Sequence, residues 1–320
     1  MDIRQMRYFL AIVEAGSISR AAQRLNVAQP SLSLHVRNME EALATPLLIR
    51  GPGGVTPTEA GDLLARRARV LLTDLDRAQE EVRGIGRDPS GAVRLGLPGT
   101  ISGILSVPLI AQCRARHPGI KIVVAEAMSG FVREWLSEGR VDLAVLYDPG
   151  GATDLTSEML LEEELVLLEA PAAPDRRAAT GPVAATDLPA MPLILPSEAH
   201  GLRQMIDATL AVAGRAASVP EIEVDSYAAI KRLVEDGYGA SVLPFHAVAQ
   251  EVSEGRLSVR PFAGDRLWRA AHLVRATARP ETAATRAVRD LLRAVAVGLI
   301  DQGVWAGARR PRGFDRPSID

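Results

Sequence analysis

The spacing of apolar residues changes at a short linker, GIGRDPSG at residues 84–91, and this change limits the possible folds more than any other feature of the sequence. Before the linker, apolar residues recur mainly at the spacing of an amphipathic helix. After the linker, short apolar runs alternate with helical segments as far as residue 297. Such alternation predicts parallel sheets with helices on both faces. Because 320 residues exceed one typical core, we expect two or three domains.

The first 58 residues are predicted to hold three short helices and a glycine-rich hairpin. The first helix covers residues 3–15 and ends at Gly16, and Ser17 can cap the second helix. The hairpin turns at residues 51–54 (GPGG). Two helices joined by a tight turn, beside a third helix and a hairpin, fit a winged helix-turn-helix, although an ordinary three-helix cluster fits the same spacing. The third helix carries an apolar stripe of Leu32, Val36, Met39 and Leu43.

The other face of the third helix is typical of a surface that reads DNA. Recognition helices contact bases chiefly through their N-terminal residues, and a proline in the first turn loses no hydrogen bond. Gln pairs with adenine, Ser bonds to bases or phosphates, and an apolar group suits the thymine methyl. Residues 1–58 carry six arginines against four acidic residues, within a chain of formal net charge −2. The candidate DNA contacts are Gln29, Pro30, Ser31, Ser33, Leu34, Arg37, Arg50, Thr56 and Thr58.

A long helix is predicted to follow, capped by Thr56 or Thr58 and running to about Val82. Its apolar residues form an approximate heptad seam, which favours pairing with a second copy of the chain. Packing against the later domain is the alternative. The seam consists of Ala60, Leu63, Leu64, Arg67, Val70, Leu71, Leu75, Ala78 and Val82, and Arg67 interrupts it.

Residues 1–90 resemble the N-terminal domain of the LysR-type transcriptional regulators. The matching stretches are MRYFLAIVEAGSISRAAQRLNVAQPSLSLHVRNMEEAL, PLLIR and VTPTEAG. The later chain is similar to the same family through ARHPGIKIVV, EGRVDLAVLY, LEEELVLL, LPAMPLILP, HGLR and VDSYAAIKRLVEDGYGASVLP. Within the family, LLIRGPGGVTPTEAG and VDLAVLYDP look most like the nitrogen assimilation control branch.

The resemblance implies an α/β multidomain regulator that binds promoter DNA, contacts RNA polymerase and forms a homodimer or homotetramer through the long helix. Its C-terminal part is expected to resemble periplasmic solute-binding proteins, with a small-molecule cleft between two α/β lobes. Residues 298–320, rich in Gly, Pro and Arg, are predicted to be a disordered tail. The expected divisions are 1–58 for the winged helix-turn-helix, 59–90 for the linker helix and hinge, 91–161 with 266–297 for lobe one, and 162–265 for lobe two.

The sequence departs from the family at two positions in the predicted DNA-binding domain. Many members carry a basic residue where this chain has Leu34, and another at the hairpin tip, where this chain has Gly-Pro-Gly-Gly. We therefore expect Arg37 and Arg50 to make more of the phosphate contacts.

Hydroxyl residues at the starts of helices mark the candidate small-molecule site. LGLPGTISG at residues 95–103 places two of them at a helix N-terminus, where N–H groups and the helix dipole attract an anion. Simple helix capping is the alternative. The resemblance implies that the effector lies against this loop. We expect Arg203 to neutralise a carboxylate or other oxyanion of the effector, and a solvated helix residue is the alternative for Arg203. The expected effector contacts are Thr100, Ser102, Ser129, Tyr147, Ser197, His200, Arg203 and Ser226.

Catalysis, metal binding and a cofactor are not predicted. Ser197 and His200 lie close in the sequence, but no acid is placed to complete a triad. The five histidines show no metal-ligand spacing with Cys113 or with carboxylates. An exported solute-binding protein would need a signal peptide, which the first residues do not resemble. A single cysteine and the lack of a bilayer-length apolar run predict a cytoplasmic protein without a membrane partner. A ligand-independent regulator, which uses its C-terminal part only to oligomerise, remains an alternative.

Overall fold

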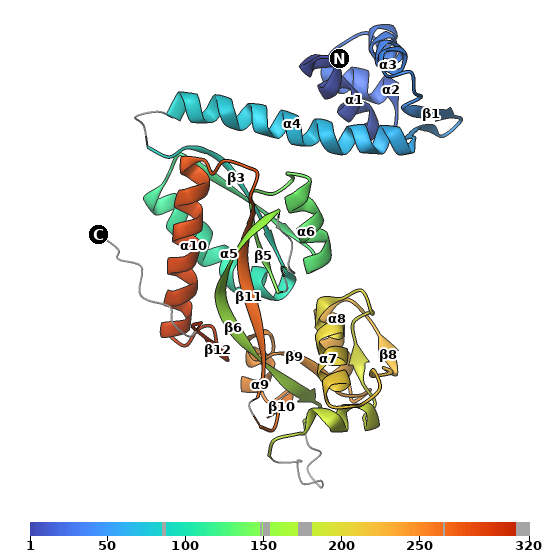
Figure 1. Ribbon diagram of the computed structural model, residues 1–320. Helices are drawn as coiled ribbons and strands as arrows, with labels where there is room; N and C mark the ends of the chain where they lie inside the picture. Colours follow the sequence, from blue (N-terminus) through green and yellow to red (C-terminus); the bar gives the residue numbers. More distant parts are fainter. Residues whose placement is uncertain (85–87, 148, 150–153, 172–180, 265, 312–320) are drawn as a thin grey trace. The chain divides into compact units, whose positions relative to one another are not determined.

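The computed structural model describes residues 1–84, 88–147, 149, 154–171, 181–264 and 266–311. The chain divides into two compact units (Figure 1). The N-terminal unit covers Met1–Arg87 with the segment Ser137–Arg140, and the C-terminal unit covers Asp88–Leu136 and Val141–Asp320. Each unit has hydrophobic cores of its own.

The N-terminal unit contains the three predicted helices, the hairpin and the long helix. The Asp2 side chain caps the first helix, which ends at Gly16 with a left-handed φ of 58°. Ser17 caps the second helix, and Asn26 ends it with a φ of 54°. These residue types favour caps and left-handed ends, so the boundaries follow the sequence closely. The elements are α1 (Ile3–Ala15), α2 (Ile18–Leu25), α3 (Gln29–Leu43), β1 (Leu48–Gly51), β2 (Gly54–Pro57) and α4 (Glu59–Gly84).

One core joins the helices of the N-terminal unit. α4 takes part in it through Ala65, Ala68 and Leu72, so the long helix does pack within its own unit. Leu43, the predicted last member of the α3 stripe, is instead 43% exposed, because α3 ends there and Ala44 turns the chain with a left-handed φ of 49°. The fully buried side chains from α1 and α3 are Phe9, Ile12, Leu32, Val36 and Met39.

The C-terminal unit is built on an eight-stranded sheet with the order β10-β6-β11-β5-β3-β4, to which β9 and β12 are added as further partners of β6. β3 is parallel to β4 and β5, as predicted. β6 is antiparallel to β9, β10 and β11, which the parallel sheets predicted from the alternation of strands and helices do not include. The strands are β3 (Gly91–Leu97), β4 (Ile120–Glu126), β5 (Leu143–Leu146), β6 (Leu155–Glu169), β9 (Ser241–Pro244), β10 (Ser258–Pro261), β11 (Leu267–Ala276) and β12 (Ala308–Arg309), with a separate parallel pair β7 (Ile194–Leu195) and β8 (Ile222–Glu223).

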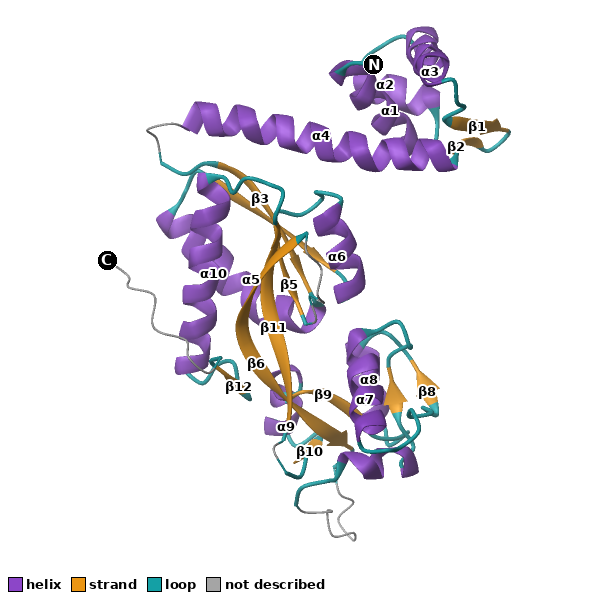
Figure 2. Ribbon diagram, viewed as in Figure 1, coloured by secondary structure: helices purple, strands orange, loops and turns teal. Residues whose placement is uncertain are grey.

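The antiparallel pairing arises because β6 and β11 carry the chain between two lobes (Figure 2). β11 pairs with β5 in lobe one, whereas β6 pairs with β9 and β10 in lobe two. The predicted boundary at residues 161–162 therefore falls inside β6. The helices are α5 (Gly99–Arg116), α6 (Ser129–Ser137) and α10 (Ala283–Asp301), which belong with lobe one, and α7 (Gly201–Val212), α8 (Tyr227–Glu235) and α9 (Ala249–Ser253), which belong with lobe two together with the 3-10 turns η1 (Ala185–Ala190) and η2 (Phe245–Ala247).

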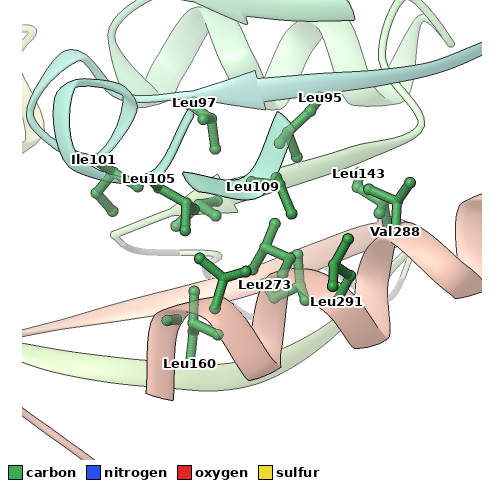
Figure 3. Close-up of a cluster of buried hydrophobic side chains, with 14 of the residues drawn as sticks. Leu95, Leu97, Ile101, Leu105, Leu109, Leu143, Leu160, Leu273, Val288 and Leu291 are labelled. Carbon is green, nitrogen blue, oxygen red and sulfur yellow. The ribbon is translucent and has the colours of Figure 1, made fainter. Parts of the chain in front are cut away.

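Each lobe has its own hydrophobic core. In lobe one, side chains from β3, α5, β5, β11 and α10 converge on one cluster, which includes Leu97, Leu105, Leu143, Leu273 and Val288 (Figure 3). The core of lobe two lies between its strands and α7 and α8. Two separately packed lobes leave room for a cleft where the crossing strands connect them.

The predicted disordered tail at residues 298–320 is wrong for residues 298–311. α10 continues to Asp301, and β12 pairs with Glu162 and Glu163 of β6. The cause is Trp305, which is only 1% exposed and donates from Nε1 to Glu163 Oε1 at 3.1 Å. Burial of one indole outweighs the Gly and Pro content around it. Residues 312–320 lie outside the described residues.

Candidate functional site

A cleft with a volume of about 830 Å³ lies within the C-terminal unit, lined by residues of both lobes. Lobe one supplies the end of β4 and the starts of α5 and α6, and lobe two supplies the start of α8 and part of η2 and α9. The cleft is thus at the carboxyl ends of strands, where ligands of such sheets bind.

The structure brings together five of the eight predicted effector contacts. Thr100, Ser129, Tyr147, His200 and Ser226 line the cleft. The other three predicted residues, Ser102, Ser197 and Arg203, do not line it, because their side chains bond within their own lobes.

Arg203 is the clearest correction among these three. It is 3% exposed, its Nε donates to Asp207 Oδ2 at 2.8 Å, and its Nη2 donates to the Ser218 carbonyl at 2.6 Å. Arg203 therefore stabilises lobe two through these bonds. It does not line the cleft, and it is not exposed to solvent. Ser102 Oγ lies 3.2 Å from Ser106 Oγ, and Ser197 Oγ donates to Asp225.

A hydrogen bond of 2.7 Å joins Thr100 Oγ1 and Tyr147 Oη at the start of α5. Burial raises the pKa of Tyr147 well above 10, and the nearby Glu163 raises it further, so the phenol stays protonated. The N-cap of α5 is Pro98, which gives no side-chain hydrogen bond to the first turn. The first N–H groups of α5 therefore have no side-chain cap.

His200 closes the cleft on the lobe-two side. Its Nδ1 accepts from the Leu202 backbone N–H at 3.1 Å, and its Nε2 lies 3.1 Å from Tyr227 Oη. Burial first, and then the positive charge of Arg269, lower the pKa of His200 from 6.5 to about 4, against a smaller opposing effect of Asp225. The imidazole is therefore neutral near neutral pH.

Protonation of His200 should destabilise the C-terminal unit in acid. Between about pH 6.5 and about pH 4 the unfolded chain binds the proton that the folded chain excludes, so the free energy of unfolding falls as the pH falls. Relative to His200→Gln, the wild type should lose roughly 2–3 kcal/mol over this window. Urea unfolding followed by tryptophan fluorescence measures it, because Trp135, Trp268 and Trp305 all lie in this unit. If the difference in the free energy of unfolding between the wild type and His200→Gln is the same at all pH values, the lowered pKa of His200 is contradicted.

The sequence prediction missed several buried polar residues beside the cleft. Glu163 on β6 and Arg269 on β11 are cross-strand partners, 1% and 4% exposed. Glu163 Oε1 lies 3.3 Å from Nδ1 of His246, which also lines the cleft. The Arg269 guanidinium stacks 3.6 Å above the ring centre of Tyr147. β6 carries Glu162, Glu163 and Glu164 in a row, and β11 carries Arg269. Charged residues within predicted strands were the available signal, which an interpretation based on helix starts does not use.

The N-terminal unit presents the predicted DNA-reading face of α3. The start of α3 is exposed at Gln29, Pro30 and Ser31, and Leu34 is 54% exposed. Gln29 Nε2 donates to Ser33 Oγ at 3.1 Å, so these two groups form one polar patch. Arg37 and, on the hairpin, Arg50 and Thr56 are also exposed.

Thr58 differs from the other predicted DNA contacts. Its Oγ1 accepts from Gly61 N at 3.0 Å, which caps α4, and donates to the Pro46 carbonyl at 2.8 Å. Thr58, and not Thr56, is therefore the cap of the long helix, and its hydroxyl is already engaged.

Comparison with known proteins identifies both units. Residues 3–62 match the family described as bacterial regulatory helix-turn-helix protein, lysR family, and residues 86–297 match the LysR substrate binding domain. The chain belongs to the LysR family. This LysR-family protein is thus a DNA-binding transcriptional regulator and not an enzyme, in agreement with the sequence prediction.

Individual LysR-type regulators are similar to this chain over most of its length. It is 34% identical over 245 residues to the nitrogen assimilation regulatory protein nac of Escherichia coli (strain K12), covering 76% of this chain and 78% of that protein. It is 30% identical over 257 residues to the regulator BbuR of Bordetella bronchiseptica, covering 80% and 78%. A full-length OxyR variant from Pseudomonas aeruginosa shares the fold, with a TM-score of 0.73 at 22% identity over 99% of both chains.

The described residues of the LysR-type regulator hold no helix long and apolar enough to cross a membrane. Within the same residues, no three His, Cys, Asp or Glu side chains are grouped to bind a metal ion.

Proposed function

We propose that this regulator binds promoter DNA through α3 and the β1–β2 hairpin, and that a small metabolite in the cleft controls the response. The observation that carries the proposal is a cleft lined by both lobes in a chain whose N-terminal unit exposes the start of a recognition helix. CbnR, which shares the fold with a TM-score of 0.67 at 20% identity, has been solved with its target DNA, and supports the DNA-binding half.

The exposed side chains of α3 have separate parts in DNA recognition. Gln29, Ser31 and Ser33 offer hydrogen-bonding groups to base edges, and Leu34 offers an apolar contact that suits a thymine methyl. Arg37 and Arg50 supply positive charge to the phosphates without reading sequence. The free N–H groups at the start of α3 can bind one more phosphate, because Ala28 gives no side-chain cap.

Substitutions on α3 test this division. Arg37→Ala should weaken binding about tenfold on every DNA sequence and reduce the salt dependence, whereas Ser33→Ala should change the preferred base. Gel shifts on the natural promoter and on a randomised site measure both effects. Arg66→Ala, which removes an exposed arginine of α4, is the matched control. Unchanged binding in both α3 variants would exclude α3 as the reading helix.

Pairing of two copies through α4 fits the surface that this helix leaves uncovered within its unit. Leu63, Leu71 and Val82 are 49%, 51% and 71% exposed. A second α4 that covered them would form the homodimer, or part of a homotetramer, that binds two half-sites. RNA polymerase is the expected partner at the promoter, and the cytoplasm is the expected compartment.

Lobe closure on the ligand would change how the copies pack and so change the angle between paired DNA-binding domains. Such a mechanism requires a ligand that prefers the closed state. If candidate ligands bind the cleft but leave the DNase footprint and the DNA bend unchanged, the ligand-independent alternative is favoured, in which the C-terminal unit serves only for oligomerisation.

A further inference from the structure

The cleft contains carboxylates that an anionic ligand would not need. Glu126 is the last residue of β4, and Asp225 lies between β8 and α8, and both line the cleft. Asp225 accepts from the Ser197 backbone N–H and from Ser197 Oγ, both at 2.9 Å. Glu126 is exposed, and no ion pair joins it to another described residue. Two carboxylates thus line this cleft.

The basic side chains that line the cleft do not cancel these charges. Lys231 Nζ lies 2.5 Å from Glu251 Oε1 and donates to the Ala247 carbonyl at 3.1 Å, so its charge is already paired. His200 is buried and hydrogen-bonded as a neutral ring. The Glu126 side of the cleft therefore attracts a cation, because a concave surface concentrates the field of its charges.

A second hollow of about 630 Å³ adjoins the cleft and shares Ser129 and Tyr147 with it. Its lining contains arginines in place of carboxylates. Arg269 lines it, together with the first residues of α6 and with Gly201 at the start of α7. Two helix N-termini and two arginines, Arg133 and Arg269, thus line the same space.

Arg269 lines this second hollow and carries a donor that no described residue accepts from. The side chain is buried, and Nη1 has no hydrogen-bond partner among the described residues. Glu163, its cross-strand partner, directs Oε1 to His246 and Trp305 instead. A buried charged donor without an acceptor is costly, so an oxyanion at this position would be bound strongly.

We propose that the ligand is a small aminocarboxylate, an amino acid in its zwitterionic form. Its carboxylate meets Arg269 and the helix starts, and its ammonium group faces Glu126 and Asp225. Ser129 and Tyr147, which border both hollows, lie between the two ends. This inference rests on the proposed function, and it replaces the expected purely anionic ligand, because Arg203 does not line the cleft.

The test is isothermal titration of the full chain with each of the proteinogenic amino acids. Every amino acid that binds is then compared with its 2-oxo acid, which lacks the amine, and with its decarboxylated amine. We expect at least one amino acid to bind, and both analogues to bind at least about tenfold more weakly.

Glu126→Gln is expected to weaken that amino acid about tenfold, because it removes the charge that faces the ammonium group. Glu134→Gln is the matched control, since Glu134 is an exposed carboxylate of α6 that lines neither hollow. It should bind the amino acid like the wild type.

Binding of the 2-oxo acid as tightly as the amino acid, or the absence of binding by every amino acid, would overturn the inference. The promoter footprint separates this failure from failure of the proposed function. A 2-oxo acid that binds and shifts the footprint overturns the aminocarboxylate and leaves ligand control intact. A wild-type chain that gives no footprint on any promoter overturns the proposed function itself.

Discussion

Replacing Trp305 with alanine is expected to lower the free energy of unfolding of the C-terminal unit by about 4 kcal/mol. The indole is 1% exposed within the lobe-one core, so its removal leaves a cavity that the surrounding side chains fill only in part. It also removes the donor at 3.1 Å from Glu163 Oε1, a buried carboxylate that would keep only the contact with His246. Both losses occur where Trp305 contacts β6.

Urea unfolding of the Trp305→Ala protein can be followed by the fluorescence of Trp135 and Trp268, which lie in the same unit. Trp305→Phe keeps most of the volume and loses the N–H group, so a loss of about 2 kcal/mol is expected. Val212→Ala changes a side chain that is 92% exposed and should stay within about 0.5 kcal/mol of the wild type. Equal stability of Trp305→Ala and the wild type would mean that the buried indole does not stabilise the C-terminal unit.

Elements with strong local signals could be predicted from the sequence. Gly16, Ser17 and Asn26 mark the ends of α1 and α2, and they do so through backbone preferences that operate within a few residues. The parallel strands β3, β4 and β5 were predicted for the same reason, because each is bounded by its own helix or turn.

Elements that depend on distant partners could not be predicted. Residues 302–311 have no periodicity, and contacts with residues far away in sequence order them, such as the Trp305 bond to Glu163 and the pairing of β12 with β6. β6 and β11 run antiparallel because they connect the lobes, which no local pattern expresses. Tertiary packing decides such segments and overrides composition.

In the candidate site, too, residues with a local sequence signal were predicted and residues that depend on distant neighbours were not. Thr100, Ser129 and Ser226 start helices, so capping patterns led to them, and all three line the cleft. The sequence does not show which of Arg203 and Arg269 has a hydrogen-bond donor left for a ligand. Arg203 lies in α7 and Arg269 in β11, and the residue type is the same. Asp207 and the Ser218 carbonyl accept from Arg203, whereas Nη1 of Arg269 has no hydrogen-bond partner among the residues that the structure describes. The difference depends on neighbours that only the folded chain brings together.

Gly61→Ala is expected to destabilise the N-terminal unit by about 3 kcal/mol and to abolish promoter binding. A Cβ at this position of α4 would lie 2.0 Å from the Leu47 carbonyl oxygen and 3.2 Å from Pro57 Cβ. The Leu47 carbonyl cannot move away freely, because it accepts from Thr58 N at 3.0 Å. Glu40 of α3 also holds this segment by accepting from the Leu47 N–H at 2.8 Å. The added methyl group must therefore separate α4 from the hairpin and disturb α3.

Gly53→Ala is the matched control, because a Cβ at Gly53 in the hairpin turn would meet no atom within 4 Å. Its stability should stay within about 0.5 kcal/mol of the wild type. Thermal unfolding by far-UV circular dichroism and a promoter gel shift measure the two expected effects. Tryptophan fluorescence should be unchanged in both variants, since every tryptophan lies in the C-terminal unit. If Gly61→Ala binds the promoter like the wild type, α3 keeps its position without the hairpin, and DNA recognition would then depend on α3 alone.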